Sequence, residues 1–174
     1  MNQVITLPVE FELSVKPGAV MDALYKMLGA RFVESPELSQ KSAISPSSPD
    51  IGEYWAGMGG IYAGVARGRD GEPDYHLILC KEDPKKDCTW QAALDLAKTI
   101  TADGHSDFSV PTRFESALLY ANLHDQFEAD RWHWTSTQYS EITAWMQDFA
   151  SGGQGSSGKS PERRVRFVRR TSIL

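Results

Sequence analysis

Two short helices are predicted near the middle of the sequence, and neither is long enough to be stable in water on its own. Thr89 is placed to cap a helix that runs over residues 90–102. Thr112 and Glu115 have the spacing of a capping box, which indicates a second helix over residues 113–126. Because such helices need tertiary packing, we expect both to lie against a sheet, and this requirement constrains the fold strongly.

Segments with the pattern of β-strands lie on both sides of these helices. Residues 60–65 and 75–80 predict a hairpin with its turn at residues 69–71. The small, polar, glycine-rich residues 150–160 are expected to form a loop. Three further short strands are predicted after the helices, over residues 132–137, 144–149 and 164–170. The chain is therefore predicted to be an α+β protein, with two short helices packed on small antiparallel sheets.

The N-terminal part has a different character. Residues 5–15 alternate between apolar and polar side chains, which predicts a half-buried strand, and a helical pattern follows Pro17. Residues 34–50 are rich in Ser and Pro and are interpreted as a linker. We therefore expect a strand–helix extension over residues 1–33, which is a possible oligomerisation unit, and a binding domain over residues 51–174.

The 174-residue chain is mildly acidic, with a formal net charge of −5. Nucleic-acid-binding domains usually carry an excess of basic residues, so the charge disfavours nucleic acid as the main partner. No apolar run approaches the roughly 18–20 residues that cross a bilayer, and no signal-peptide pattern is visible at the N-terminus. We expect a protein that stays in the cytoplasm or is associated with a virion, without membrane contact.

Cysteine, histidine and acidic residues form no pattern typical of a metal or catalytic site. Cys80 and Cys88 lack the spacing of a zinc pair; a disulfide between them is possible, although a reducing compartment favours free thiols. The acidic residues of the C-terminal third form no dense calcium-binding loop. The four histidines show no H-x-x-x-H spacing; they are His76, His105, His124 and His133. The sequence therefore predicts no metal, no cofactor and no enzymatic activity.

The order of the C-terminal motifs resembles a known family. Trp132–Thr137 has the form Trp-x-Trp-Thr-Ser-Thr, Ala144-Trp145 begins another strand, and Val165–Arg170 ends the set. Together they resemble the Legionella-collagen-like protein C-terminal (Lcl_C) domain family, over residues 52–170. The family often carries Asp-Trp-Arg-Leu-Pro-Thr before the second helix, whereas residues 107–112 here read Asp-Phe-Ser-Val-Pro-Thr. The turn and the helix cap survive this difference, but the Trp and Arg are replaced.

The resemblance implies a fold similar to that of C-type lectins and of the formylglycine-generating enzyme. It also implies a phage or prophage protein that binds a protein or a glycan through its C-terminal loops. Some relatives are variable proteins of diversity-generating retroelements, and residues 151–160 have the small, polar character of a variable region. The copper-binding cysteines of the formylglycine-generating enzyme are not carried over, because Cys80 and Cys88 precede the first helix of the domain.

Candidate ligand-binding residues lie in the C-terminal third. Trp132 and Trp134 point to the same face of their predicted strand. With Trp145 they form either a stacking platform for a ligand or part of the hydrophobic core. If that face is the core, His133 and Thr135 face outward. The predicted ligand-binding set is Trp132, His133, Trp134, Trp145, Gln147, Asp148, Gln154, Ser156, Ser157 and Lys159.

Five arginines fall within eight residues near the C-terminus, and three interpretations of them are open. They belong to a strand with Val165 and Phe167 inward and the arginines in ion pairs, or they contact an acidic protein partner, or they contact nucleic acid. In the second case Arg163, Arg164 and Arg166 would dock on a host protein. The chain would then be a cytoplasmic inhibitor or regulator, which is the alternative to a multivalent display protein built from several copies.

Overall fold

The computed structural model describes residues 48–173. The predicted N-terminal strand and helix, and most of the predicted linker, lie outside these residues. The described part is a mixed α+β domain with two α-helices and two sheets, in which strands predominate. This confirms the predicted α+β class, but the prediction of purely antiparallel sheets was wrong, because the strands that pair at His133 and Arg164 run parallel.

The first sheet is antiparallel and contains the predicted hairpin. Its strand order is β1-β2-β3-β9, with the bounds Tyr54–Trp55, Gly60–Ala66, Tyr75–Cys80 and Val168–Ser172. The hairpin turn lies at Arg69–Glu72, where the Glu72 amide donates to the Arg69 carbonyl at 3.0 Å. Asp70 and Gly71 have φ angles of 56° and 91°, and positive φ at both central residues is what a type I′ turn requires. The Asp-Gly pair therefore specifies the turn, as predicted.

The second sheet contains the aromatic strand and two strands that we did not expect, β4 and β7. Its order is β4-β8-β5-β6-β7, with the bounds Asp87–Cys88, Arg163–Arg164, Trp132–Gln138, Thr143–Asp148 and Gln154–Gly158. The prediction of a loop over residues 150–160 was wrong, because β7 lies within it. Gly152 has a φ of 76° and turns the chain, so that residues 154–158 pair antiparallel with β6 through backbone groups alone.

The arginine-rich segment is two strands rather than the single predicted one. β8 pairs with β4 and β5 in the second sheet, whereas β9 pairs with β3 in the first sheet. Val165 and Phe167 lie on the chain between them and are buried at 1% and 0% exposure. This segment therefore connects the two sheets, and it leaves the second sheet because its apolar side chains enter the core.

Both predicted helix starts are confirmed. The Thr89 side chain accepts a hydrogen bond from the Ala92 amide at the start of α2 (Trp90–Ala97). The capping box of Thr112 and Glu115 is complete at the start of α3 (Arg113–Leu123), which continues as a short 3₁₀ helix, η2 (His124–Gln126). α2 is shorter than predicted, because after Ala97 the backbone amides donate to carbonyls three residues earlier and the α-helical pattern stops. A tight turn with Asp103 and Gly104 at positive φ comes later.

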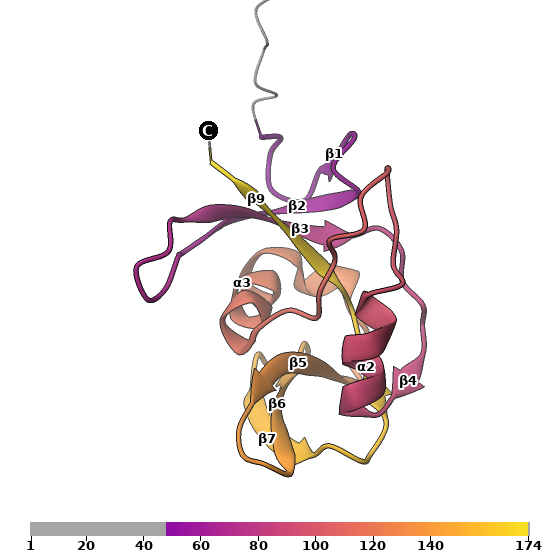
Figure 1. Ribbon diagram of the computed structural model, residues 1–174. Coiled ribbons are helices and arrows are strands. Elements are labelled where there is room, and N and C mark those ends of the chain that lie inside the picture. Colours follow the sequence, from indigo (N-terminus) through magenta and orange to yellow (C-terminus); the bar gives the residue numbers. More distant parts are fainter. Residues whose placement is uncertain (1–47, 174) are drawn as a thin grey trace, which may run out of the picture. The chain divides into compact units, whose positions relative to one another are not determined.

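Each helix supplies a separate part of the core. On α2, Trp90 and Ala93 pack in one cluster with Trp134 of the second sheet and with Phe167 of the segment that connects the sheets. α3 lies between the two sheets (Figure 1), and its buried residues pack with Leu77, Leu79, Phe149 and Val168. Cys80 and Cys88 are buried and unpaired, and burial raises the pKa of both thiols. No helix in the described part is long and apolar enough to span a membrane.

Candidate functional site

Arginine and aromatic side chains from distant parts of the chain stack on one another near the start of α3. The guanidinium carbon of Arg69 lies 3.6 Å from the centre of the Phe114 ring. That of Arg113 lies 3.8 Å from the Trp145 ring and 5.5 Å from the Phe114 ring. Tyr139 meets Trp145 edge to face, with ring centres 5.2 Å apart. We call these five residues the arginine–aromatic surface.

Four separate elements place these residues. Arg69 lies on the β2–β3 turn, Arg113 and Phe114 are the first residues of α3, Trp145 is on β6, and Tyr139 follows β5. Phe114 is 49% exposed and Tyr139 is 61% exposed, so these rings are displayed and are not part of either core. Guanidinium groups over ring faces are attractive contacts that order flexible side chains on a surface.

A pocket of about 640 Å³ adjoins this surface, between β2, the β2–β3 turn and the first turns of α3. We call it the α3 pocket. Its apolar walls are Val65, Ala66, Tyr75, Phe114 and Leu118. Thr112, Glu115 and Thr137 also line it, with the exposed side chains of Arg67, Arg69 and Glu72. The volume lies within the range of about 300–1,000 Å³ that is typical of ligand pockets.

Glu115 is the one lining carboxylate that is buried, at 2% exposure. Arg170 donates to both of its oxygens, at 2.6 and 2.7 Å, and the Tyr75 hydroxyl and the Thr112 amide donate at 2.8 and 2.7 Å. Burial by itself would raise the pKa of Glu115, but the hydrogen bonds and charge of Arg170 outweigh it and lower this pKa. Glu115 is therefore held ionised, and its oxygens are occupied.

Two of the predicted ligand-binding residues belong to the arginine–aromatic surface or support it. Trp145 is part of the surface, and Gln154 lies under Arg113. The Gln154 side chain accepts from Arg113 Nε at 3.3 Å and donates to the Arg113 carbonyl at 2.7 Å. Across the β6–β7 pair, Ser156 is opposite Trp145 and is exposed, and Ser157 is half-buried.

Other predicted ligand residues have structural contacts. The Asp148 carboxylate accepts from the Ser151 hydroxyl and from the Ala150 and Ser151 amides, and so closes the β6–β7 turn. The hydrogen bond from the Ser151 hydroxyl, with those from the amides, lowers the pKa of Asp148. The Lys159 ammonium donates to the Glu141 carbonyl at 2.7 Å and lies 4.4 Å from the Trp90 ring. These contacts tie the ends of β6 and β7 to their neighbours.

Three of the predicted ligand residues are buried: Trp134 at 1%, His133 at 5% and Gln147 at 1% exposure. Trp132, which is 37% exposed, lies beside Gly155. The expectation that His133 and Thr135 face outward was wrong, because both faces of β5 are covered. The His133 ring packs edge-on against Phe127 and Phe149, and burial lowers its pKa to about 4.

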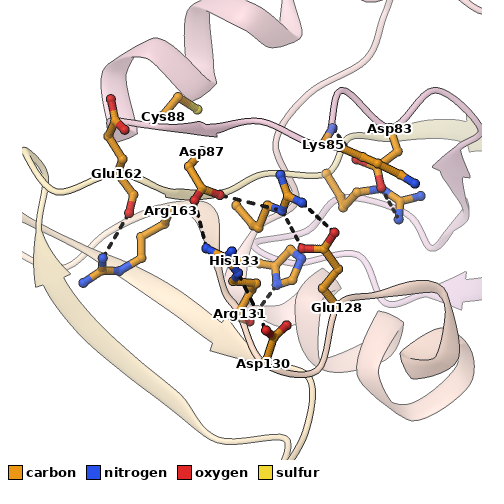
Figure 2. A network of polar contacts seen from close by, with 12 residues as sticks. Asp83, Lys85, Asp87, Cys88, Glu128, Asp130, Arg131, His133, Glu162 and Arg163 are labelled. Atoms are coloured by element: carbon orange, nitrogen blue, oxygen red, sulfur yellow. Dashed lines mark hydrogen bonds and ion pairs between the residues drawn. The ribbon is translucent and has the colours of Figure 1, made fainter.

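Four of the five C-terminal arginines, Arg164, Arg166, Arg169 and Arg170, are held in ion pairs, which supports the first of the three interpretations. Arg164 donates to Glu128 at 2.7 Å, and Arg166, which is 7% exposed, lies 3.5 Å from Asp83. Figure 2 shows Glu128 and Asp87 within this network. Arg163 donates to the Glu162 carbonyl and has no carboxylate partner among the residues that the structure describes. Of the three arginines predicted to dock on a partner, two are therefore engaged internally.

Arg69, Arg113, Phe114 and Tyr139 were not predicted as site residues. One signal was available in the sequence. Phe114 and Leu118 form an apolar pair four residues apart, out of phase with the core pair Leu119 and Leu123. A second apolar stripe on a short helix indicates a second packing or binding surface. Among residues 48–173, no group of three or more His, Cys, Asp or Glu residues is placed to hold a metal ion.

The comparisons with known proteins agree with the C-terminal motifs. The model of the Lcl C-terminal domain matches residues 70–169, which is more than half of the chain. The match includes both helices, the whole of the second sheet and the segment that links the sheets. A search of curated proteins gives no match. The predicted resemblance is thus confirmed, and the chain belongs to the Lcl C-terminal domain family.

Proposed function

We propose that this domain is a non-enzymatic binding module that holds a protein or glycan ligand on the arginine–aromatic surface and in the α3 pocket. The observation that carries the proposal is the row of stacked Arg and aromatic side chains, exposed at Arg69, Phe114 and Tyr139, beside a pocket of about 640 Å³. Aromatic and arginine side chains are the residues most enriched at the energetic centres of binding interfaces. Exposed aromatic clusters on a stable scaffold typically mark interaction sites.

The chemistry of the pocket supports binding rather than catalysis. The residues that line it include no His, Cys or Ser, and its buried carboxylate is neutralised by Arg170. A general base needs a free lone pair within reach of a substrate proton. Glu115 offers none, since its oxygens already accept four hydrogen bonds.

The proposal also covers fold relationship and origin. We propose a C-type-lectin-like arrangement in a phage or prophage protein that is displayed on a virion or kept in the cytoplasm, in several copies. Support comes from the family, and from β7, where the exposed side chain of Ser156 takes no part in either core. A position of that kind can vary without cost to the fold, as a diversified ligand surface requires.

The test is a screen of the full-length protein against a glycan array and a random-peptide library. We expect a ligand whose affinity falls about tenfold or more in Phe114→Ala and in Trp145→Ala. Arg131→Ala is the control, because this side chain is 51% exposed and belongs to the separate network of Figure 2. The proposal fails if neither collection yields a ligand, or if both aromatic variants bind as the wild type does.

A further inference from the structure

Three arginines without carboxylate partners gather at one place on an acidic protein. Among residues 48–173, Arg131, Arg164, Arg166, Arg169 and Arg170 each form an ion pair, whereas Arg67, Arg69 and Arg113 form none within the described part. Arg163 also forms none there, but it does not line the pocket. Arg67 and Arg69 line the α3 pocket, and the guanidinium carbon of Arg113 lies 5.5 Å from the Phe114 ring, which also lines it. The chain as a whole has a net charge of −5, so this positive area runs against the overall balance.

The turn that carries Arg69 is held in one conformation. The Gly68 amide donates to Asp74 Oδ1 at 2.9 Å, and a Cβ at Gly68 would stand 1.9 Å from the Glu72 carbonyl oxygen. The type I′ turn and the stacking on Phe114 fix the guanidinium of Arg69 further. A cation that is already ordered loses less conformational entropy when it meets an anion.

The polar groups in the interior of the pocket already accept internal hydrogen bonds. Glu115 binds Arg170, Tyr75 and the Thr112 amide. The Thr112 hydroxyl accepts from the Glu115 amide, and the Thr137 hydroxyl accepts from the Arg113 amide at 2.9 Å. A sugar ring presents hydroxyls that need several directional partners, and the buried carboxylate that could accept from them is used internally. The two threonine hydroxyls accept in these contacts and keep a proton to donate, so the larger free features are the apolar walls and the guanidinium groups.

From these features we infer that the α3 pocket takes an aromatic or other large apolar side chain from an acidic peptide segment of a partner protein. The carboxylates that flank this side chain pair with Arg67, Arg69 and Arg113. Glu72 is the exposed carboxylate at the pocket, and the arginines outnumber it. Burial of the apolar side chain supplies affinity, while the arginines select against basic segments. This inference rests on the proposed function and narrows its ligand class.

The experiment measures fluorescence anisotropy of three labelled ten-residue peptides with the full-length protein. One alternates Glu and Phe, one alternates Lys and Phe, and one alternates Glu and Ser. We expect the Glu–Phe peptide to bind at least about tenfold more tightly than the other two, and more weakly as salt increases. A heparin-derived sulfated oligosaccharide is the fourth probe, because a site that recognises charge alone would take it as well.

Two variants and one control test whether the peptide binds in the pocket. Arg69→Ala removes the ordered cation, and Val65→Glu adds a negative charge at a residue that is 47% exposed and lines the pocket. Each should weaken the Glu–Phe peptide about tenfold or more, with an unchanged thermal melting profile. Arg131→Ala removes the same charge from the network of Figure 2 and should change the affinity less than about twofold.

The outcomes separate the two proposals. If the Glu–Phe peptide fails to bind while the array or library yields a ligand sensitive to Phe114→Ala, this inference is overturned and the proposed function stands. Preference for the sulfated oligosaccharide over the peptide also overturns it, in favour of a polyanionic glycan. If Arg69→Ala and Val65→Glu both bind the Glu–Phe peptide as tightly as the wild type does, the peptide occupies another surface, and this too rejects the inference.

Discussion

Glu115 joins three parts of the protein through one carboxylate: the cap of α3, the α3 pocket and the first sheet. It accepts from the Thr112 amide at the cap, from Tyr75 on β3 and from Arg170 on β9. The capping box made the position of Glu115 predictable from the sequence. Its burial and its pairing with Arg170 were not, because the two residues are 55 positions apart.

Replacement of Glu115 should be among the most destabilising changes in the domain. Glu115→Ala leaves Arg170 without its anion and the Thr112 amide without its acceptor, so we expect a loss of about 3–5 kcal/mol in the free energy of unfolding. Glu115→Gln keeps an acceptor for the cap and should lose less, about 1–3 kcal/mol. Urea unfolding measures both, with the exposed Glu162→Gln as control; a loss below about 1 kcal/mol for Glu115→Ala would contradict the role of the carboxylate.

The buried His133 predicts how stability depends on pH. Burial lowers its pKa from 6.5 to about 4, so the folded state holds it neutral where the unfolded state is protonated. Stability should therefore fall as pH decreases from 6.5 to 4, by up to about 3 kcal/mol once both states are protonated. His133→Gln, which cannot titrate, should flatten this part of the curve. Urea unfolding at pH 7, 5.5 and 4.5 tests it; parallel curves for the two proteins would refute it.

At the scale of elements, side-chain patterns predicted the helix starts and the hairpin turn, which depend on particular side chains. They missed a strand whose pairing depends on backbone groups. The caps of both helices and the Asp70-Gly71 turn were predicted, because each depends on particular residues. β7 was missed, because Gly and Ser give no strand pattern and its pairing with β6 follows from the turn at Gly152. The candidate site was missed in part for another reason: its residues come from four elements, and no local pattern shows that these elements meet.

The β2–β3 turn offers a test of how far one glycine sets the geometry of the pocket. Gly68→Ala places a methyl group against the Glu72 carbonyl, and the backbone must shift to accommodate it. We expect a loss of about 1–3 kcal/mol in unfolding free energy, with weaker binding of any ligand that uses Arg69. The control is Gly158→Ala outside the turn, where the backbone φ is not positive and a Cβ meets only Pro161 Cδ at an ordinary contact distance of 3.7 Å. Equal losses in the two variants would reject the steric explanation.

At the scale of the whole molecule, residues 163–170 decide how the two sheets are joined. The sequence offered the inward positions of Val165 and Phe167, with ion pairs for the arginines around them, as one of three open interpretations. It did not predict that the segment crosses from the second sheet to the first, because alternation over a few residues describes one strand equally well. Arg166 lies at the crossing, where it donates to the carbonyls of Gln126 and Cys80.

Arg166 and Arg163 are close in sequence, but we expect the removal of Arg166 to destabilise the protein much more than the removal of Arg163. Arg166→Ala leaves Asp83 and two carbonyls without their buried donor between the sheets, which should cost about 2–4 kcal/mol of unfolding free energy. Arg163→Ala removes the same charge from a half-buried side chain without a described carboxylate partner, and should cost less than about 1 kcal/mol.

Urea unfolding followed by far-ultraviolet circular dichroism and by tryptophan fluorescence compares the stability of the two variants. Because Arg166 ties both sheets together, the two signals should shift by the same amount in Arg166→Ala; a shift in one signal alone would mean that the sheets unfold independently.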